Sequence, residues 1–134
     1  MIDKMKSYGI LFVDDVENIL ESYDVLFEDF KQYNRLFARN GMEGIDMYKK
    51  FSPELVITDN IMPKKDGLEM STDIKNISKE KNKPVYILMV SSLEDWNRLK
   101  LSARFHGQVD GTMIKPFDID KLTNRVTKEL ERFK

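Results

Sequence analysis

Apolar residues are concentrated in five short runs, each followed by polar residues. The runs lack the alternation of apolar and polar positions that marks a strand with one face in water. Short continuous apolar runs are typical of strands buried on both faces of a sheet. We therefore predict five buried strands, at residues 10–13, 36–38, 55–59, 85–90 and 112–114.

Between these runs, apolar residues recur every three or four positions, which is the spacing of one face of an α-helix. Ser52-Pro53 marks the end of one such segment, and residues 79–83 form a charged stretch that we expect to be a loop. A connection with glycines is expected at residues 107–111. The spacing predicts helices at residues 16–30, 42–51, 68–77 and 94–105 and from about residue 118.

The order of the predicted elements is strand then helix, five times over, without an internal sequence repeat. Such alternation is typical of an α/β fold, a doubly wound five-stranded parallel sheet with helices on both faces. Right-handed crossovers favour the flavodoxin-like strand order 2-1-3-4-5. The first and third strands are then neighbours, so Asp14, Asp15 and Asp59 are expected to meet at one edge of the sheet.

The length of the chain fits one domain, residues 1–134. The chain has 22 basic and 23 acidic residues, so its net charge is −1. This balance argues against direct nucleic-acid binding. Cysteine is absent and His106 is the one histidine, which excludes disulfides, thiol catalysis and histidine metal clusters. The apolar run at residues 8–13 is too short for a secretory core or a membrane span. We therefore expect a cytoplasmic protein without a membrane partner.

Four of the predicted strands end in a chemically functional group: Asp14-Asp15, Asp59, Ser91 and Lys115. Each group alone also has a local explanation, since Asp and Ser cap helices and open turns. Together they place three carboxylates, a hydroxyl and a cation on one rim of the sheet. Two carboxylates about 4 Å apart repel by roughly 4 kcal/mol at an effective dielectric of 20, so the rim needs more positive charge than Lys115 supplies.

Oxygen ligands without His or Cys favour Mg²⁺ over zinc at such a rim. Mg²⁺ is commonly held by one or two carboxylates together with a phosphate. A phosphoryl group on Asp59 would complete this arrangement, because carboxylates can act as nucleophiles and form aspartyl phosphates.

The chain resembles a response-regulator receiver domain of two-component signalling, the CheY-like family, from Ile10 to about Arg132. The resemblance rests on these residues in this order and spacing: Val13-Asp14-Asp15, Asn40-Gly41, Asp59-Asn60-Ile61-Met62-Pro63, Asp66-Gly67, Ser91 and Lys115-Pro116-Phe117.

The resemblance implies that Asp59 is the phosphorylated residue and contributes to an Mg²⁺ site. Asp15 is expected to bind the ion directly, and Asp14 mostly through water. The backbone carbonyl of Ile61 is expected to be a further ligand.

The resemblance also implies roles for two residues beside the phosphoryl group. The Ser91 hydroxyl is expected to bond one phosphoryl oxygen, and Lys115 to pair with another. The Lys115-Pro116 bond is expected to be cis, which the small cis–trans difference of X-Pro bonds allows.

Several positions depart from the family's pattern. Thr112 stands three residues before the lysine, where receivers usually have an aromatic residue that swings inward. Ile61 and Leu93 are aliphatic where polar residues often orient water, so they should obstruct hydrolysis. Gly111 stands where an acid commonly pairs with an arginine such as Arg125, which argues weakly against the receivers joined to winged-helix domains.

The connection between Ser91 and Lys115 is about two residues longer than is typical, and residues 106–110 hold the extra length. His106 is interpreted as a loop residue in this connection, not as a phosphorelay histidine.

These features predict a phosphorylation-dependent switch that is not a conventional enzyme. A sensor histidine kinase or a phosphotransfer protein would supply the phosphoryl group. The surface of the fourth helix, fifth strand and fifth helix would then signal to an effector or a fused output domain. The alternatives are a regulatory module of a longer protein with a catalytic output (such as a cyclic-dinucleotide synthase) or a DNA-binding one, a receiver that acts without phosphorylation, and a flavin-binding domain.

Overall fold

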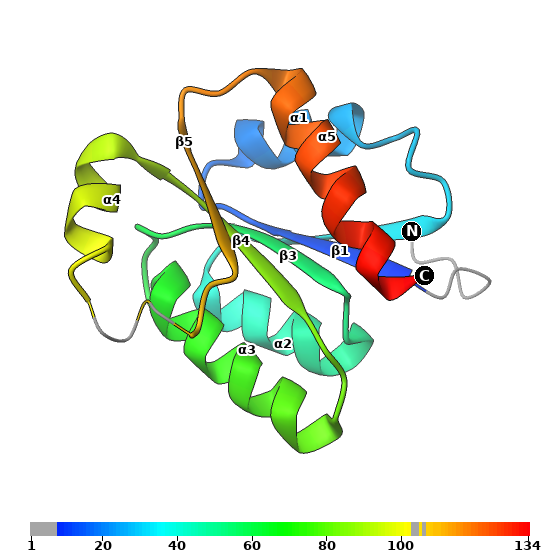
Figure 1. The fold of residues 1–134 in the computed structure, drawn as a ribbon, viewed down its shortest axis with the longest axis horizontal. Helices are drawn as coiled ribbons and strands as arrows, with labels where there is room; N and C mark the ends of the chain where they lie inside the picture. The colour runs from blue at the N-terminus through cyan, green and yellow to red at the C-terminus, as the bar shows by residue number, and fades with distance from the viewer. Residues whose placement is uncertain (1–7, 103–104, 106) are drawn as a thin grey trace.

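A computed structural model describes residues 8–102, 105 and 107–134 of the chain. A five-stranded parallel sheet forms its centre, and the strand order β2-β1-β3-β4-β5 confirms the predicted α/β fold (Figure 1). The strands are β1 (Tyr8–Val13), β2 (Tyr33–Ala38), β3 (Leu55–Asp59), β4 (Tyr86–Ser92) and β5 (Gly111–Lys115). The helices are α1 (Glu17–Leu26), α2 (Gly41–Phe51), α3 (Gly67–Lys81), α4 (Leu93–Leu99), α5 (Ile119–Leu130) and the short 3-10 helix η1 (Glu131–Phe133).

The sheet separates two hydrophobic cores, as its continuous apolar strands predict. Alternate residues of β1 pack on opposite faces of the sheet: Phe12 with residues of α1 and α5, and Leu11 with residues of α2 and α3. Figure 1 shows these two helix pairs on the two faces. The Phe12 ring stacks on Tyr23 of α1 with centroids 5.0 Å apart. Both side chains are buried, so these contacts hold β1 in the middle of the sheet and fix the positions of the residues that follow it.

The first helix ends four residues earlier than predicted. α1 stops at Leu26, and residues 27–29 form a turn in which the amide of Phe30 donates to the carbonyl of Phe27. Phe27 and Phe30 still pack together, with ring centroids 4.9 Å apart. Apolar spacing indicates which side chains face the core, but not which backbone conformation holds them there. Here a turn directs Phe27 and Phe30 toward the core, as a helix would.

The third and fourth helices also differ from their predicted bounds. α3 continues to Lys81, through part of the predicted loop at residues 79–83, and Asn82 ends it with a φ of 52° in the left-handed region. α4 stops at Leu99, whereas the prediction continued to Phe105. The amide of Ser102 bonds to the Leu99 carbonyl in a turn, which leaves Phe105 to pack from the connection that follows. His106 lies outside the described residues.

α4 lies at the β4–β5 side of the molecule, apart from the two helix pairs that cover the sheet (Figure 1). A third, small cluster supports it, made by Leu68, Met89, Leu99 and Phe105 with Trp96 and Val109 against them. None of the helices within the described ranges is both long and apolar enough to cross a membrane.

Candidate functional site

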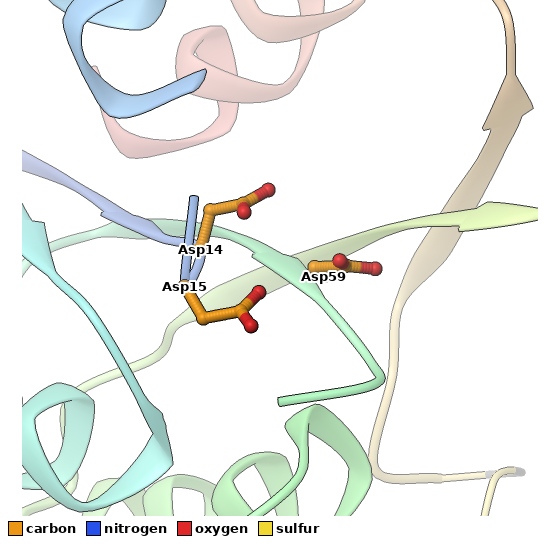
Figure 2. Close-up of side chains that lie close together, drawn as sticks. All are labelled: Asp14, Asp15 and Asp59. Atoms are coloured by element: carbon orange, nitrogen blue, oxygen red, sulfur yellow. The ribbon is translucent and has the colours of Figure 1, made fainter. Parts of the chain in front are cut away.

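The register of the sheet brings three carboxylates together at the carboxyl ends of β1 and β3. Val13 pairs with Thr58, so the residues that follow each of them, Asp14 and Asp59, leave the sheet side by side. Figure 2 shows Asp14, Asp15 and Asp59 close together at the ends of β1 and β3, and one oxygen from each lies within 4.8 Å of the others. The predicted acidic cluster is therefore present in the described structure.

Backbone amides hold two of the three carboxylates. Asp14 is 2% exposed, and its Oδ1 accepts a hydrogen bond from the Val16 amide at 2.9 Å at the start of α1. Asp59 Oδ1 accepts from the Asn60 amide at 2.8 Å. Asp15 is exposed. These bonds fix the direction of two carboxylates, while the third remains open to solvent.

Lys115 supplies the positive charge at this edge. Its Nζ lies 3.4 Å from Asp59 Oδ2, and the Lys115-Pro116 bond is cis, as predicted. Burial raises the pKa of Asp59 above its usual value, although Lys115 and the Asn60 amide act against this. Burial likewise raises the pKa of Asp14, and the nearby Asp59 charge adds to the rise. Lys115 alone therefore does not compensate the cluster.

A divalent cation fits this donor set. Three carboxylate oxygens converge, two from buried or half-buried side chains, and no nitrogen or sulfur ligand stands among them. Such all-oxygen sets suit Mg²⁺, which keeps several waters and uses few protein ligands. The exposed side of Asp15 leaves room for those waters.

Ser91 is completely buried, and its hydroxyl has no hydrogen-bond partner within the described part of the chain. The register partner of Asp59 on β4 is Val90, so Ser91 stands one position further along. A buried hydroxyl without a partner is uncommon and calls for an explanation. The predicted bond from Ser91 to a phosphoryl oxygen would provide one.

The loop after β3 is packed tightly against α3. A Cβ on Gly67 would clash with the backbone carbonyl of Asp59, so glycine lets the first turn of α3 approach the end of β3. Gly67 donates its amide to the Asn60 carbonyl at 2.7 Å. The predicted motif glycine therefore has a structural role beside Asp59.

Ile61 and Leu93 lie two residues after Asp59 and Ser91, and both are more than half exposed, at 59% and 57%. The roles predicted for the Ile61 carbonyl and for both side chains remain predictions. Two buried acids, Asp95 and Glu129, were not predicted. Asp95 is 5% exposed in the first turn of α4, and the only sequence signal was its place three residues after the capping Ser92.

The family model of the response regulator receiver domain matches residues 10–127. The chain belongs to the response regulator receiver family. Among its relatives, the chemotaxis protein CheY of Halobacterium salinarum is 32% identical over 124 residues, which cover 90% of this chain and 95% of that protein. The probable C4-dicarboxylate response regulator DctR of Bacillus subtilis is 36% identical over 97 residues.

Solved receiver structures share the fold. The Thermotoga maritima response regulator TrrA, in complex with Mg²⁺ and a beryllium fluoride, superposes with a TM-score of 0.75 at 28% identity and covers 92% of this chain. The match to DctR covers 72% of this chain but 38% of that protein. This receiver domain therefore spans nearly all of a CheY and well under half of a longer response regulator.

Proposed function

We propose that this receiver domain is an Mg²⁺-dependent phosphoacceptor in two-component signalling. A sensor histidine kinase or a phosphotransfer protein in the cytoplasm donates the phosphoryl group to Asp59. The observation that carries the proposal is the convergence of Asp14, Asp15 and Asp59 beside Lys115 at the carboxyl edge of the sheet. This convergence supports the proposal because it would let Asp59 act as a nucleophile between a bound cation and the Lys115 ammonium group.

Each residue has a defined task in the transfer. The Asp59 carboxylate attacks the phosphorus of the donor's phosphohistidine, so that an O–P bond forms as the N–P bond breaks and the donor imidazole leaves. The Asn60 amide orients Oδ1 of Asp59. Asp14, Asp15 and the Ile61 carbonyl are the proposed Mg²⁺ ligands with Asp59. Mg²⁺ supplies positive charge to the phosphoryl oxygens when it is bound. Phosphoryl transfer depends mainly on such positioning and charge neutralisation.

Lys115 and Ser91 stabilise the phosphorylated state. The Lys115 ammonium pairs with one phosphoryl oxygen and Ser91 donates its hydroxyl to another, which satisfies a group that lacks a partner in the described structure. A conformational equilibrium shifts only by the difference in interaction energy between its two states, and these two contacts supply that difference. The shift reaches the surface formed by α4, β5 and α5, where a downstream effector reads it.

A second candidate is a regulatory module of a longer protein. Relatives such as DctR are more than twice as long as the segment they share with this chain. In that case the same switch at Asp59 would control a fused output domain, either catalytic or DNA-binding. Reading the gene beyond residue 134 distinguishes this candidate from a single-domain regulator.

The proposal predicts one phosphoryl group at Asp59. Wild type is incubated with a small phosphodonor and Mg²⁺, and intact-protein mass spectrometry records the added mass. Asp59→Asn and EDTA should each abolish labelling, because the nucleophile or the cation is lost. Asp46→Asn, which changes an exposed aspartate of α2, is the matched control and should be labelled like wild type. Labelling that persists in Asp59→Asn, or that EDTA leaves unchanged, contradicts the assignment.

A further inference from the structure

Asp95 is a buried acid with little compensation. It is 5% exposed, its Oδ1 lies 3.3 Å from the Arg98 guanidinium, and its Oδ2 has no partner in the described structure. Arg98 is 67% exposed, so water weakens its effect. Buried charged groups are normally paired with an opposite charge and fully hydrogen-bonded. Asp95 therefore holds a negative charge in the interior with one weak counter-ion.

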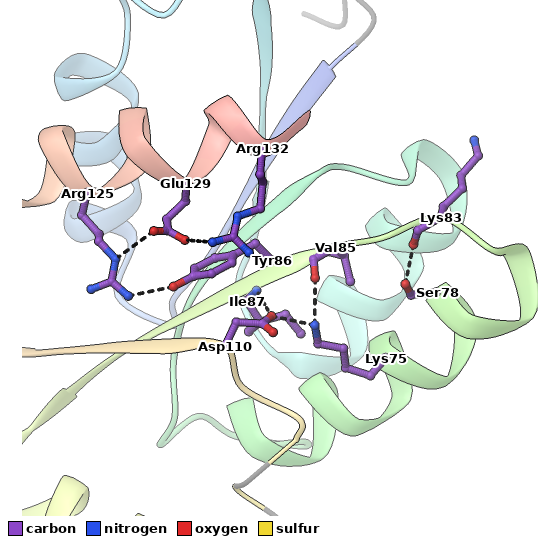
Figure 3. Close-up of polar contacts among 10 residues, drawn as sticks. All are labelled: Lys75, Ser78, Lys83, Val85, Tyr86, Ile87, Asp110, Arg125, Glu129 and Arg132. Carbon is purple, nitrogen blue, oxygen red and sulfur yellow. Dashed lines mark hydrogen bonds and ion pairs between the residues drawn. The ribbon is translucent and has the colours of Figure 1, made fainter. Parts of the chain in front are cut away.

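Glu129 shows how the same chain compensates a comparable acid. It is 4% exposed on α5, and both of its oxygens face arginines (Figure 3). Arg132 lies 2.8 Å from one oxygen and Arg125 lies 3.6 Å from the other, while Arg125 also donates to the Tyr86 hydroxyl. Glu129 has an arginine near each carboxylate oxygen, whereas Asp95 has one exposed arginine near one oxygen. Weak charge compensation is therefore a feature of Asp95 in α4 and not of both buried acids.

Besides Arg98, Asp95 contacts Asn60, the residue that follows Asp59. Asn60 Nδ2 donates to Asp95 Oδ1 at 3.4 Å, within buried surroundings. The remaining bonds of Asn60 are shorter: its amide donates to Asp59 at 2.8 Å, and its Oδ1 accepts from the Leu68 amide at 2.9 Å. Asn60 is thus fixed to Asp59 and α3, and its long bond to Asp95 is the weakest of the set.

We propose that Asp95, acting through Asn60, is the positioning residue by which α4 responds to the charge on Asp59. The inference rests on the proposed function. With Mg²⁺ already bound, a phosphoryl group adds negative charge at Asp59. Asp95 is shielded from solvent, so this added charge repels it more strongly than it would repel an exposed acid. The arrangement with Asp95 beside Asn60 becomes less favourable, and the first turn of α4 shifts.

Coupling between two sites is reciprocal. If added charge at Asp59 disfavours the Asp95 position, then removing the Asp95 charge must make added charge at Asp59 more favourable. Removing the Arg98 charge must have the opposite effect, since it leaves Asp95 less compensated. A purely structural role for Asp95 would not produce opposite effects from these two changes.

The test uses the phosphoryl analogue beryllofluoride at saturating Mg²⁺, with Trp96, the neighbour of Asp95, as the fluorescent reporter. Asp95→Asn keeps the shape of the side chain and should bind the analogue about fivefold more tightly, with a smaller fluorescence change. Arg98→Gln should bind about twofold more weakly. Glu94→Gln removes an exposed acid of the same turn and should bind like wild type.

The outcomes separate this inference from the proposed function. If wild type binds the analogue but Asp95→Asn has unchanged affinity and an unchanged Trp96 response, the role of Asp95 is wrong and the phosphoacceptor proposal stands. The same conclusion follows if Asp95→Asn and Arg98→Gln shift the affinity in the same direction. If wild type shows no binding that depends on Asp59, the proposed function fails and the inference fails with it.

Discussion

At the scale of single residues, the site combines carboxylates with exposed aliphatic neighbours. Ile61 and Leu93 leave the ends of β3 and β4 and stay more than half exposed. Neither side chain packs in the hydrophobic core, because a core side chain would be shielded from solvent. An aspartyl phosphate is lost when water attacks phosphorus, and water needs a polar group to orient it and accept its proton. Neither side chain can provide one.

We therefore predict slow loss of phosphate from wild type and faster loss from the double variant Ile61→Asn with Leu93→Glu. The rate should rise about tenfold, a modest part of what a positioned proton acceptor contributes. Phosphate release after removal of the phosphodonor is the measurement. Leu101→Glu, which places a polar group at an aliphatic position that is 83% exposed, is the control and should match wild type. Equal rates for the double variant and wild type would reject the shielding argument.

At the scale of elements, α4 is the shortest α-helix of the described structure and the one with the smallest apolar support. It spans only Leu93–Leu99 and rests on the small cluster around Met89. Thr112 is the register partner of Met89 on β5, so no large ring of β5 packs here. Instead the Trp96 and Phe105 rings meet edge to face with centroids 5.3 Å apart. A shift of α4 would therefore change the surroundings of Trp96 directly.

This arrangement predicts that the switch depends on Ser91 and not on Thr112. Beryllofluoride with Mg²⁺ should change Trp96 fluorescence in wild type. Ser91→Ala should reduce the change by about half or more, because the hydroxyl contributes to the energy difference between the two states. Thr112→Ala should have little effect. A response that is lost in Thr112→Ala and kept in Ser91→Ala would show that Thr112 itself is the switch residue.

At the scale of the whole molecule, the acidic site lowers the free energy of unfolding. Burial raises the pKa of Asp14 and Asp59 in the folded protein. Between the unfolded and the folded pKa, the folded protein binds more protons than the unfolded chain. The free energy of unfolding therefore falls as pH rises through this window, and the loss is complete above it. A cation that binds only the folded state offsets this loss.

We predict that Asp14→Asn stabilises the metal-free protein by about 1 kcal/mol at neutral pH, because it removes a buried charge and keeps an acceptor for the Val16 amide. The gain should shrink as pH falls through the raised pKa of Asp14, and it should be absent below the ordinary aspartate pKa of about 4, where the carboxyl is protonated in both the folded and the unfolded protein. Urea unfolding with EDTA measures both values. Added Mg²⁺ should stabilise wild type more than Asp14→Asn. A variant that is less stable than wild type in EDTA at neutral pH would contradict this account.

The sequence by itself determined the order of the elements and the grouping of the site. Apolar runs without alternation, each followed by a helical pattern, are typical of a parallel sheet, and a parallel sheet gathers its strand ends at one edge. Asp14, Asp15, Asp59 and Lys115 could therefore be placed together before any coordinates were considered. The cis bond before Pro116 was expected from the resemblance to the receiver family, and the structure confirms it.

Only the tertiary structure decided where α1 and α4 end and which buried polar groups meet. Apolar spacing cannot distinguish a helix from a turn that keeps the same side chains inward, as at Phe27. Spacing also cannot reveal that Asn60 bonds to Asp95, since the two are 35 positions apart, one in the loop after β3 and the other in α4. Whether a charge is buried depends on how separate elements pack, and this information does not lie in any single stretch of the chain.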